Sequence, residues 1–200
     1  MSNSTKHGYS AGKAQELAGM AIFTAIVIVL QLLGSFVRFG PFSISLVLVP
    51  IVIGAALYGA KAGAWLGFVF GVIVVALDAG PFLAVNVLGT VITCIAKGAL
   101  AGFCAGLTYK ALSHVNEVAA TAAAAVVCPL VNTGVFLIGC FLFFLPTVTA
   151  WGEAAGFANV GSYMIFGLVG LNFIVEMAVN VVLSPVIVRL IKIAKIMRNA

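Results

Sequence analysis

The sequence predicts an all-α integral membrane protein with six transmembrane helices and with both termini in the cytoplasm. Hydrophobic residues make up 64% of the 200 residues and charged residues 8%, and the mean hydropathy of the chain is +1.26. Apolar runs such as 21–30 and 69–77 do not alternate with polar residues, as the strands of a membrane barrel do. Because backbone polar groups in lipid must be satisfied internally, we expect these runs to be helices.

Six apolar segments follow a short polar N-terminal tail at residues 1–14. A helix needs about 20 residues to cross a bilayer, so residues 15–200 have the length for one six-helix membrane domain. The second and third segments are short, and the joint between them at 59–63 has a glycine at each end, which is typical of a helix break. The predicted spans are 15–36, 44–60, 62–78, 84–111, 117–146 and 161–190.

Basic residues set the predicted orientation. With the N-terminus inside, Arg38 falls outside and Lys97 falls within a span, and the other eight of the ten basic residues are cytoplasmic. This bias follows the positive-inside rule. The net charge of +5 therefore indicates topology, and we expect no nucleic-acid binding, because no basic patch with interleaved aromatics lies outside the spans. The cytoplasmic basic residues are Lys6, Lys13, Lys61, Lys110, Arg189, Lys192, Lys195 and Arg198.

Small residues recur every four positions on several predicted helices. On the fourth span Gly98, Gly102 and Gly106 form one face, and Gly67 and Gly71 form another on the third span. Close backbone approach holds helices together in lipid, so these faces are predicted to pack within the bundle. A similar face on the first span, Ala18, Ala21 and Ala25, fits either internal packing or a partner subunit.

Two opposite charges lie at similar depths in the predicted spans, Lys97 in the fourth and Glu176 in the sixth. A charge near the bilayer centre costs about 2.5–3.5 kcal/mol on insertion scales, so each needs a partner. One hypothesis is a structural ion pair between them. The other is that Glu176 contacts a donor-bearing or cationic substrate while Lys97 reaches the inner interface.

Amide side chains accompany Glu176. Asn172 and Asn180 lie four residues before and after it, so the three share one helix face that must point into the bundle. Asn132 and Thr133 follow Pro129 halfway along the fifth span. A lone amide in a membrane helix more often joins two helices than binds a ligand. Several at compatible depths predict a polar cavity.

The chain lacks the sequence patterns of common enzymes. It has no P-loop, no Gly-x-Ser-x-Gly, no His-Glu-x-x-His and no metal-ligand spacing among its four cysteines. We therefore expect no enzyme activity, no metal site and no cofactor in this chain. The predicted outer connections 37–43, 78–83 and 147–160 all carry aromatic residues, which fits either an interfacial belt or a lid over a pocket.

Several segments together resemble one family. The stretch 45–71, the basic-then-glycine run 97–110, the run 129–133 and the segment 172–180 are similar in order and spacing to the substrate-binding (S) components of energy-coupling factor (ECF) transporters, in the riboflavin- and pantothenate-type branch. The likeness begins at about residue 15. These are multi-pass proteins of bacterial and archaeal cell membranes.

The resemblance implies capture of a vitamin-like micronutrient from outside. It also implies docking on a transmembrane coupling (T) protein and two ATPase subunits, which use the ATP. The docking face would be Ala21 and Ala25, or Ala14 and Ala18 with the same spacing. Ligand contacts would lie in the outer half, with Glu176 deeper. The predicted substrate-binding residues are Arg38, Asn86, Asn132, Thr133, Trp151, Asn172 and Glu176.

Three other functions remain open from the sequence. A proton-coupled secondary transporter would use Glu176 as its proton carrier, although it would usually show inverted repeats, which are not apparent. A small intramembrane enzyme would rest on Lys97 and Glu176. A scaffold subunit would bind no ligand at all.

Overall fold

The computed structural model describes residues 4–35, 38–39, 42–43 and 46–199, with side chains for 14–35, 46–194 and 196. The elements along the chain are α1 (Ser4–Gly34), β1 (Arg38–Phe39), β2 (Phe42–Ser43), α2 (Leu48–Tyr58), α3 (Ala60–Leu77), α4 (Gly80–Leu83), α5 (Val87–Leu112), α6 (Glu117–Phe143), α7 (Leu145–Ala154), α8 (Val160–Ser162), the π-helix η1 (Tyr163–Leu168) and α9 (Gly170–Asn199).

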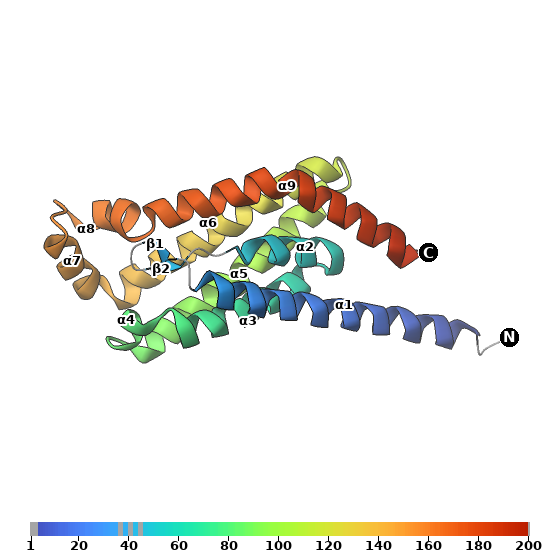
Figure 1. Ribbon diagram of the computed structural model, residues 1–200, viewed down its shortest axis with the longest axis horizontal. Coiled ribbons are helices and arrows are strands. Elements are labelled where there is room, and N and C mark those ends of the chain that lie inside the picture. Colours follow the sequence, from blue (N-terminus) through green and yellow to red (C-terminus); the bar gives the residue numbers. More distant parts are fainter. Residues whose placement is uncertain (1–3, 36–37, 40–41, 44–45, 200) are drawn as a thin grey trace.

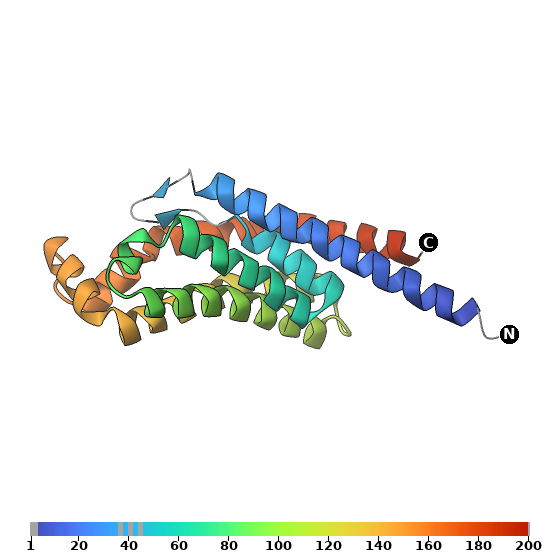
Figure 2. The ribbon, with the colours of Figure 1, turned by 90° about the horizontal axis from the view of Figure 1, so that it is seen from below.

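The long helices run along one axis of the molecule (Figure 1). Both termini lie at one end of this axis, and α4, α7 and α8 lie at the other end, in both views (Figures 1 and 2). Six crossings would place the termini in this way, but the number of crossings remains a prediction from the sequence. We call the end with α4 and α7 the distal end; its extracellular position remains a prediction from the basic residues.

Within the part of the chain that the structure describes, five helices are long and apolar enough to cross a membrane: Ala14–Gly34, Ala60–Leu77, Val87–Leu112, Glu117–Phe143 and Gly170–Ala194. They correspond to five of the six predicted spans. The second predicted span, 44–60, is shorter than expected, because its helix α2 has only 11 residues. The predicted break at 59–63 is narrower in the structure: Gly59, with φ 91°, a conformation that favours glycine, separates α2 from α3, which already begins at Ala60.

The sixth predicted span, 161–190, is interrupted. The π-helix η1 ends at Leu168, where the Val169 amide donates to the Met164 carbonyl five residues back at 3.3 Å. Helix α9 starts at Gly170 and continues past residue 190 to Asn199. Such π-turns widen a helix locally and are frequent at functional sites. After this turn, α9 packs against α6 and α2.

Other predicted boundaries also shift. Helix α1 begins at Ser4, so residues 4–14, predicted as a polar tail, continue the first helix. The connection 147–160 contains most of α7, and the connection 78–83 contains α4. In the connection 37–43, β1 and β2 pair antiparallel, with Arg38 opposite Ser43.

Helices α3 and α5 pack along the predicted glycine faces, which we call the glycine seam. A Cβ added at Gly67 would overlap the backbone of Gly98, and one at Gly63 would overlap the backbone of Gly102. A Cβ at Gly71 would lie 2.5 Å from the Cys94 carbonyl oxygen. No side chain fits between the two backbones, so the sequence spacing alone correctly predicted this internal interface.

Two apolar clusters complete the packing. The larger surrounds α2, whose Leu48, Ile51 and Val52 are fully buried against the neighbouring helices. The smaller lies at the distal end, where Phe82 of α4 and Phe144 are buried together with residues of α7 and η1. Between these clusters the interior becomes polar.

Candidate functional site

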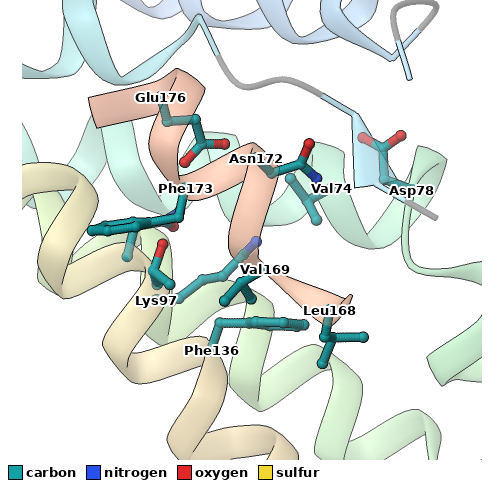
Figure 3. A pocket seen from close by; sticks show the side chains of 11 residues that line it. Val74, Asp78, Lys97, Phe136, Leu168, Val169, Asn172, Phe173 and Glu176 are labelled. Atoms are coloured by element: carbon teal, nitrogen blue, oxygen red, sulfur yellow. The ribbon is translucent and has the colours of Figure 1, made fainter. Parts of the chain in front are cut away.

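A cavity opens between α3, α5, α6 and the junction of η1 with α9 (Figure 3). Each helix contributes to it from the half that lies towards the distal end. The cavity has a volume of about 60 Å³. Its lining residues are Val74, Asp78, Lys97, Asn132, Thr133, Phe136, Leu168, Val169, Asn172, Phe173 and Glu176.

Helix α9 provides an amide and a carboxyl group to the cavity. Asn172 and Glu176 are one helical turn apart and both line it, and Glu176 is 6% exposed. Asn180 is fully buried one turn further, where its Nδ2 donates to the Glu176 backbone carbonyl at 2.8 Å. The sequence therefore correctly predicted that this polar face points into the bundle. Of the three residues on this face, Asn172 and Glu176 line the cavity.

Helix α6 provides Asn132, Thr133 and Phe136. Asn132 is 5% exposed, and its Oδ1 has no hydrogen-bond partner among the described residues; the same holds for Oδ1 of Asn172 across the cavity. Buried polar atoms in folded proteins are nearly always hydrogen-bonded. Two amides with unused bonding capacity, one from α6 and one from α9, are therefore candidates to bind a ligand in this cavity.

Lys97 of α5 brings a positive charge to the same cavity. Its ammonium lies 5.5 Å from the ring centroid of Phe70 and 5.3 Å from that of Phe136. Aromatic faces attract a cation, and this attraction is stronger where water is excluded. The rings explain how an ammonium group is held within a membrane span. The ion pair between Lys97 and Glu176 remains a prediction, now with both residues on one cavity.

Sequence reasoning missed Asp78, which caps the end of α3 and lines the cavity. Its Oδ2 accepts hydrogen bonds from Gln31 Nε2 at 2.8 Å and from Ser35 Oγ at 2.9 Å. Asp78 thereby ties the distal end of α1 to the cavity wall. The available signal was its rarity: it is the one aspartate of the sequence and follows an apolar run directly.

Three predicted ligand residues are not part of the cavity lining that the structure describes. Asn86 caps the N-terminus of α5, where its Oδ1 accepts from the Gly89 amide at 2.9 Å. Trp151 of α7 packs on Phe82, with ring centroids 5.4 Å apart. Arg38 lies in β1, but its side chain is outside the described residues.

Aromatic residues cover the cavity at the distal end. Phe82 is 5% exposed and lies at the centre of the group, with Phe144 at 4.9 Å and Phe136 at 5.7 Å between ring centroids. Since Phe136 also lines the cavity, this group links α4 and α7 directly to it. The aromatic residues of two predicted outer connections, Phe82 and Trp151, thus pack over the cavity.

Helix α1 has two different faces. Its inner face contacts the bundle: Val27 is fully buried, and a Cβ at Gly19 would overlap the Tyr58 hydroxyl. The outer face carries small residues that are exposed, Ala14, Ala18, Ala21 and Ala25. The sequence left two hypotheses for this small-residue face, internal packing and contact with a partner subunit. The exposed alanines fit the second hypothesis.

The described residues include no cluster of three His, Cys, Asp or Glu side chains that could hold a metal ion. No curated protein and no solved structure matches the chain. A family model described as "ECF transporter, substrate-specific component" matches residues 15–188. This match covers most of the chain, including every helix that lines the cavity. The protein therefore belongs to the family of substrate-specific components of ECF transporters, a family of transport subunits.

Proposed function

We propose that this chain captures a vitamin or related micronutrient from outside the cell and binds it in the cavity between α3, α5, α6 and α9. The observation that carries this proposal is the gathering of Asn132, Asn172 and Glu176 on one interior cavity. Ligand sites combine apolar walls with a few convergent polar groups, and this cavity has both. With the predicted orientation, the cavity lies in the outer half of the membrane.

Ligand binding requires the cavity to widen. A volume of about 60 Å³ holds only a few water molecules, while ligand sites for drug-sized molecules span roughly 300–1,000 Å³. The π-turn at η1 supplies Leu168 and joins α9 to the distal aromatic group. We propose that movement of η1, α7 and α8 away from α4 admits the ligand.

The energy for release comes from partner subunits in this proposal. Ala21 and Ala25 on the outer face of α1 dock on a transmembrane coupling (T) protein, and two ATPase subunits hydrolyse ATP. The exposure of both alanines supports this docking. The membrane is that of a bacterial cell, and riboflavin and pantothenate are the first candidate cargoes.

The test is ligand capture by the purified protein. We expect mass spectrometry to detect a co-purified small molecule and thermal-shift assays against a vitamin panel to show stabilisation by the same compound. Asn172→Ser should weaken its binding at least tenfold, because one hydrogen bond in the cavity is lost. Asn86→Ser is the matched control: serine also caps helices, so binding should be unchanged.

Two outcomes contradict the proposal. One is a blank across the whole panel with no co-purified molecule. The other is an equal loss of binding in Asn172→Ser and Asn86→Ser, which would indicate that the ligand does not bind in the cavity.

A proton-coupled secondary transporter is the second candidate function, because Glu176 is a nearly buried carboxyl group on the cavity. It predicts uptake by this chain alone in proteoliposomes, abolished when the pH gradient collapses. The capture subunit predicts no uptake without the coupling protein and ATPases.

A further inference from the structure

We infer that the ligand carries an uncharged amide-type group, with N–H donors for the side-chain oxygens of Asn132 and Asn172 and a carbonyl that accepts a hydrogen bond. Carboxamides, lactams, imides and cyclic ureas have this chemistry. The inference rests on the proposed function and deepens it by assigning a chemical class to the cargo. The observation behind it is a pair of buried amide oxygens on the cavity that have no hydrogen-bond partner among the described residues.

The two oxygens come from different helices. Asn132 belongs to α6 and is 5% exposed, and it lines the cavity together with Asn172 of α9. Figure 3 shows the Asn172 amide projecting from α9, with Lys97 and the Phe136 ring across from it. Because a buried polar group without a hydrogen bond is unfavourable, two such groups on one cavity indicate a site that a ligand completes.

Hydrogen-bond chemistry specifies what the ligand presents to these two side chains. The oxygen of an asparagine only accepts, so it needs a donor from the ligand. The NH2 group beside that oxygen only donates, so it needs an acceptor at a neighbouring position. An amide has an N–H and a carbonyl next to each other and can therefore satisfy both atoms of one asparagine. A hydroxyl group has a single hydrogen to donate and cannot serve two oxygens.

The charges of the cavity favour an uncharged ligand. Asp78 Oδ2 accepts from Gln31 and Ser35, and Glu176 also has interactions within the protein. No cationic ligand is therefore required to compensate these two carboxylates. An anionic ligand would lie beside both of them, because both line the cavity, and repulsion between like charges is strong where water is excluded.

Lys97 and the apolar walls fit the same ligand. The Lys97 ammonium lies 5.5 Å from the ring centroid of Phe70 and 5.3 Å from that of Phe136. A ring face attracts the charge but does not provide the lone pairs of an oxygen acceptor. The carbonyl of an amide provides them without adding a charge to the cavity. Phe173 and Val169 are apolar parts of the lining, so the remainder of the ligand is apolar.

The experiment compares small probes that share a pyridine ring and differ in one group. Thermal shifts and binding isotherms of the purified protein would be measured with nicotinamide, methyl nicotinate, nicotinate, 3-pyridinemethanol and 3-(aminomethyl)pyridine. These present a carboxamide, a carbonyl without N–H, an anion, a hydroxyl and a cation. We expect nicotinamide to stabilise the protein most. Methyl nicotinate should bind about tenfold more weakly, because it keeps the carbonyl and lacks the N–H donors.

Two variants test whether the amides of the cavity make these contacts. Asn132→Leu and Asn172→Leu replace each amide by an apolar side chain of similar size, and each should weaken nicotinamide about tenfold. The thermal midpoint without ligand should stay the same or rise, because each variant loses a buried oxygen that has no partner among the described residues. Asn116→Ser is the matched control: Asn116 caps the N-terminus of α6, and serine also caps helices, so binding should be unchanged.

Three results would overturn the amide inference and keep the capture function. One is binding of methyl nicotinate or of a charged probe as tight as that of nicotinamide, a comparison that uses the unchanged protein and does not depend on how a variant folds. The second is a lower midpoint in both leucine variants with equal losses of every probe, which would assign the amides to helix packing. The third is a co-purified compound without an amide-type N–H.

A blank with every pyridine probe would also overturn the inference, since water alone would then satisfy the two oxygens. The co-purified molecule and the vitamin panel test the capture function separately. If these are blank as well, the inference and the proposed function both fail.

Discussion

The glycine seam and the polar cavity are two interfaces of one helical bundle, and they are built in opposite ways. Along the seam, α3 and α5 meet backbone to backbone, because Gly63, Gly67 and Gly98 leave no side chain between them. At the cavity, Asn132 and Asn172 line the walls with amide oxygens that have no hydrogen-bond partner among the described residues. α5 takes part in both, with its glycines on one side and Lys97 on the other.

The difference shows how this protein separates stability from recognition. Tight packing of small residues is the main attraction between helices in lipid, because lipid is as apolar as the side chains. Polar groups without partners weaken packing but give a ligand something to bind. We therefore expect substitutions in the seam to act on folding and substitutions in the cavity to act on binding.

The largest effect should come from Gly67→Leu. A side chain at this position meets the Gly98 carbonyl and the Ala99 amide nitrogen, and backbone atoms cannot move aside as a flexible side chain can. Overpacking of this kind costs about 3 kcal/mol or prevents folding. Size-exclusion chromatography in detergent and thermal unfolding would measure it. Gly134→Leu is the matched control, because a Cβ there meets nothing within 4 Å. Equal losses of stability in both variants would contradict the prediction that close packing at the glycine seam stabilises the fold.

Glu176→Gln should lower ligand affinity about 100-fold, since removal of one member of a buried charge contact costs roughly 2–5 kcal/mol. The thermal midpoint of the unliganded variant is measured alongside, so that a change in stability can be separated from a change in affinity. Glu153→Gln is the control, because Glu153 is exposed on α7 and lies away from the cavity lining. Isothermal titration with the co-purified compound would provide the affinities. Unchanged affinity in Glu176→Gln would contradict a role for the Glu176 carboxyl in ligand binding.

Asp78→Asn tests the contact that joins the distal end of α1 to the cavity wall. Hydrogen bonds to a charged group contribute about 1.5–3 kcal/mol, so we expect a loss of roughly that size when the carboxylate becomes an amide. Gln31→Met removes one donor of the same contact. If the contact is shared, the double variant should lose less than the sum of the single variants in thermal unfolding. Full additivity would show that the contact contributes little.

The smallest effect on stability should come from Ala21→Trp, since Ala21 is exposed on α1. Substitutions at such surface sites usually change stability by less than about 0.5 kcal/mol. Co-purification with the coupling protein and ATPases should nevertheless be lost, and ligand binding should be kept. Leu33→Trp, at an exposed position closer to the distal end, should leave the complex intact. Retention of the complex in Ala21→Trp would place the docking face elsewhere.

The sequence alone predicted those features that depend on the residue spacing within one helix. The four-residue spacing of Gly98 and Gly102 predicted the seam, and the same spacing from Asn172 to Glu176 predicted an inward polar face. It was not sufficient where the structure depends on a partner helix. Asp78 became part of the site because Gln31 of α1 reaches it, and nothing in the local sequence of either residue indicates that contact.

Helix boundaries failed for a related reason. Residues 161–190 form one long apolar run, so composition could not reveal the π-turn that ends at Leu168. Asn86 is a predicted ligand contact because of the resemblance to S components. Its position directly before a helix is also the signal for an N-cap, and the structure shows that cap; the ligand contact stays a prediction.

The helix α2 is too short to cross a bilayer by itself. Eleven residues give about 16 Å of helix at about 1.5 Å per residue, roughly half of the 30 Å hydrocarbon layer. Seven of these residues are buried, so protein and not lipid surrounds most of the helix. Because neighbouring helices cover most of its surface, α2 does not need the length of a membrane span, and its apolar side chains serve the interior of the bundle.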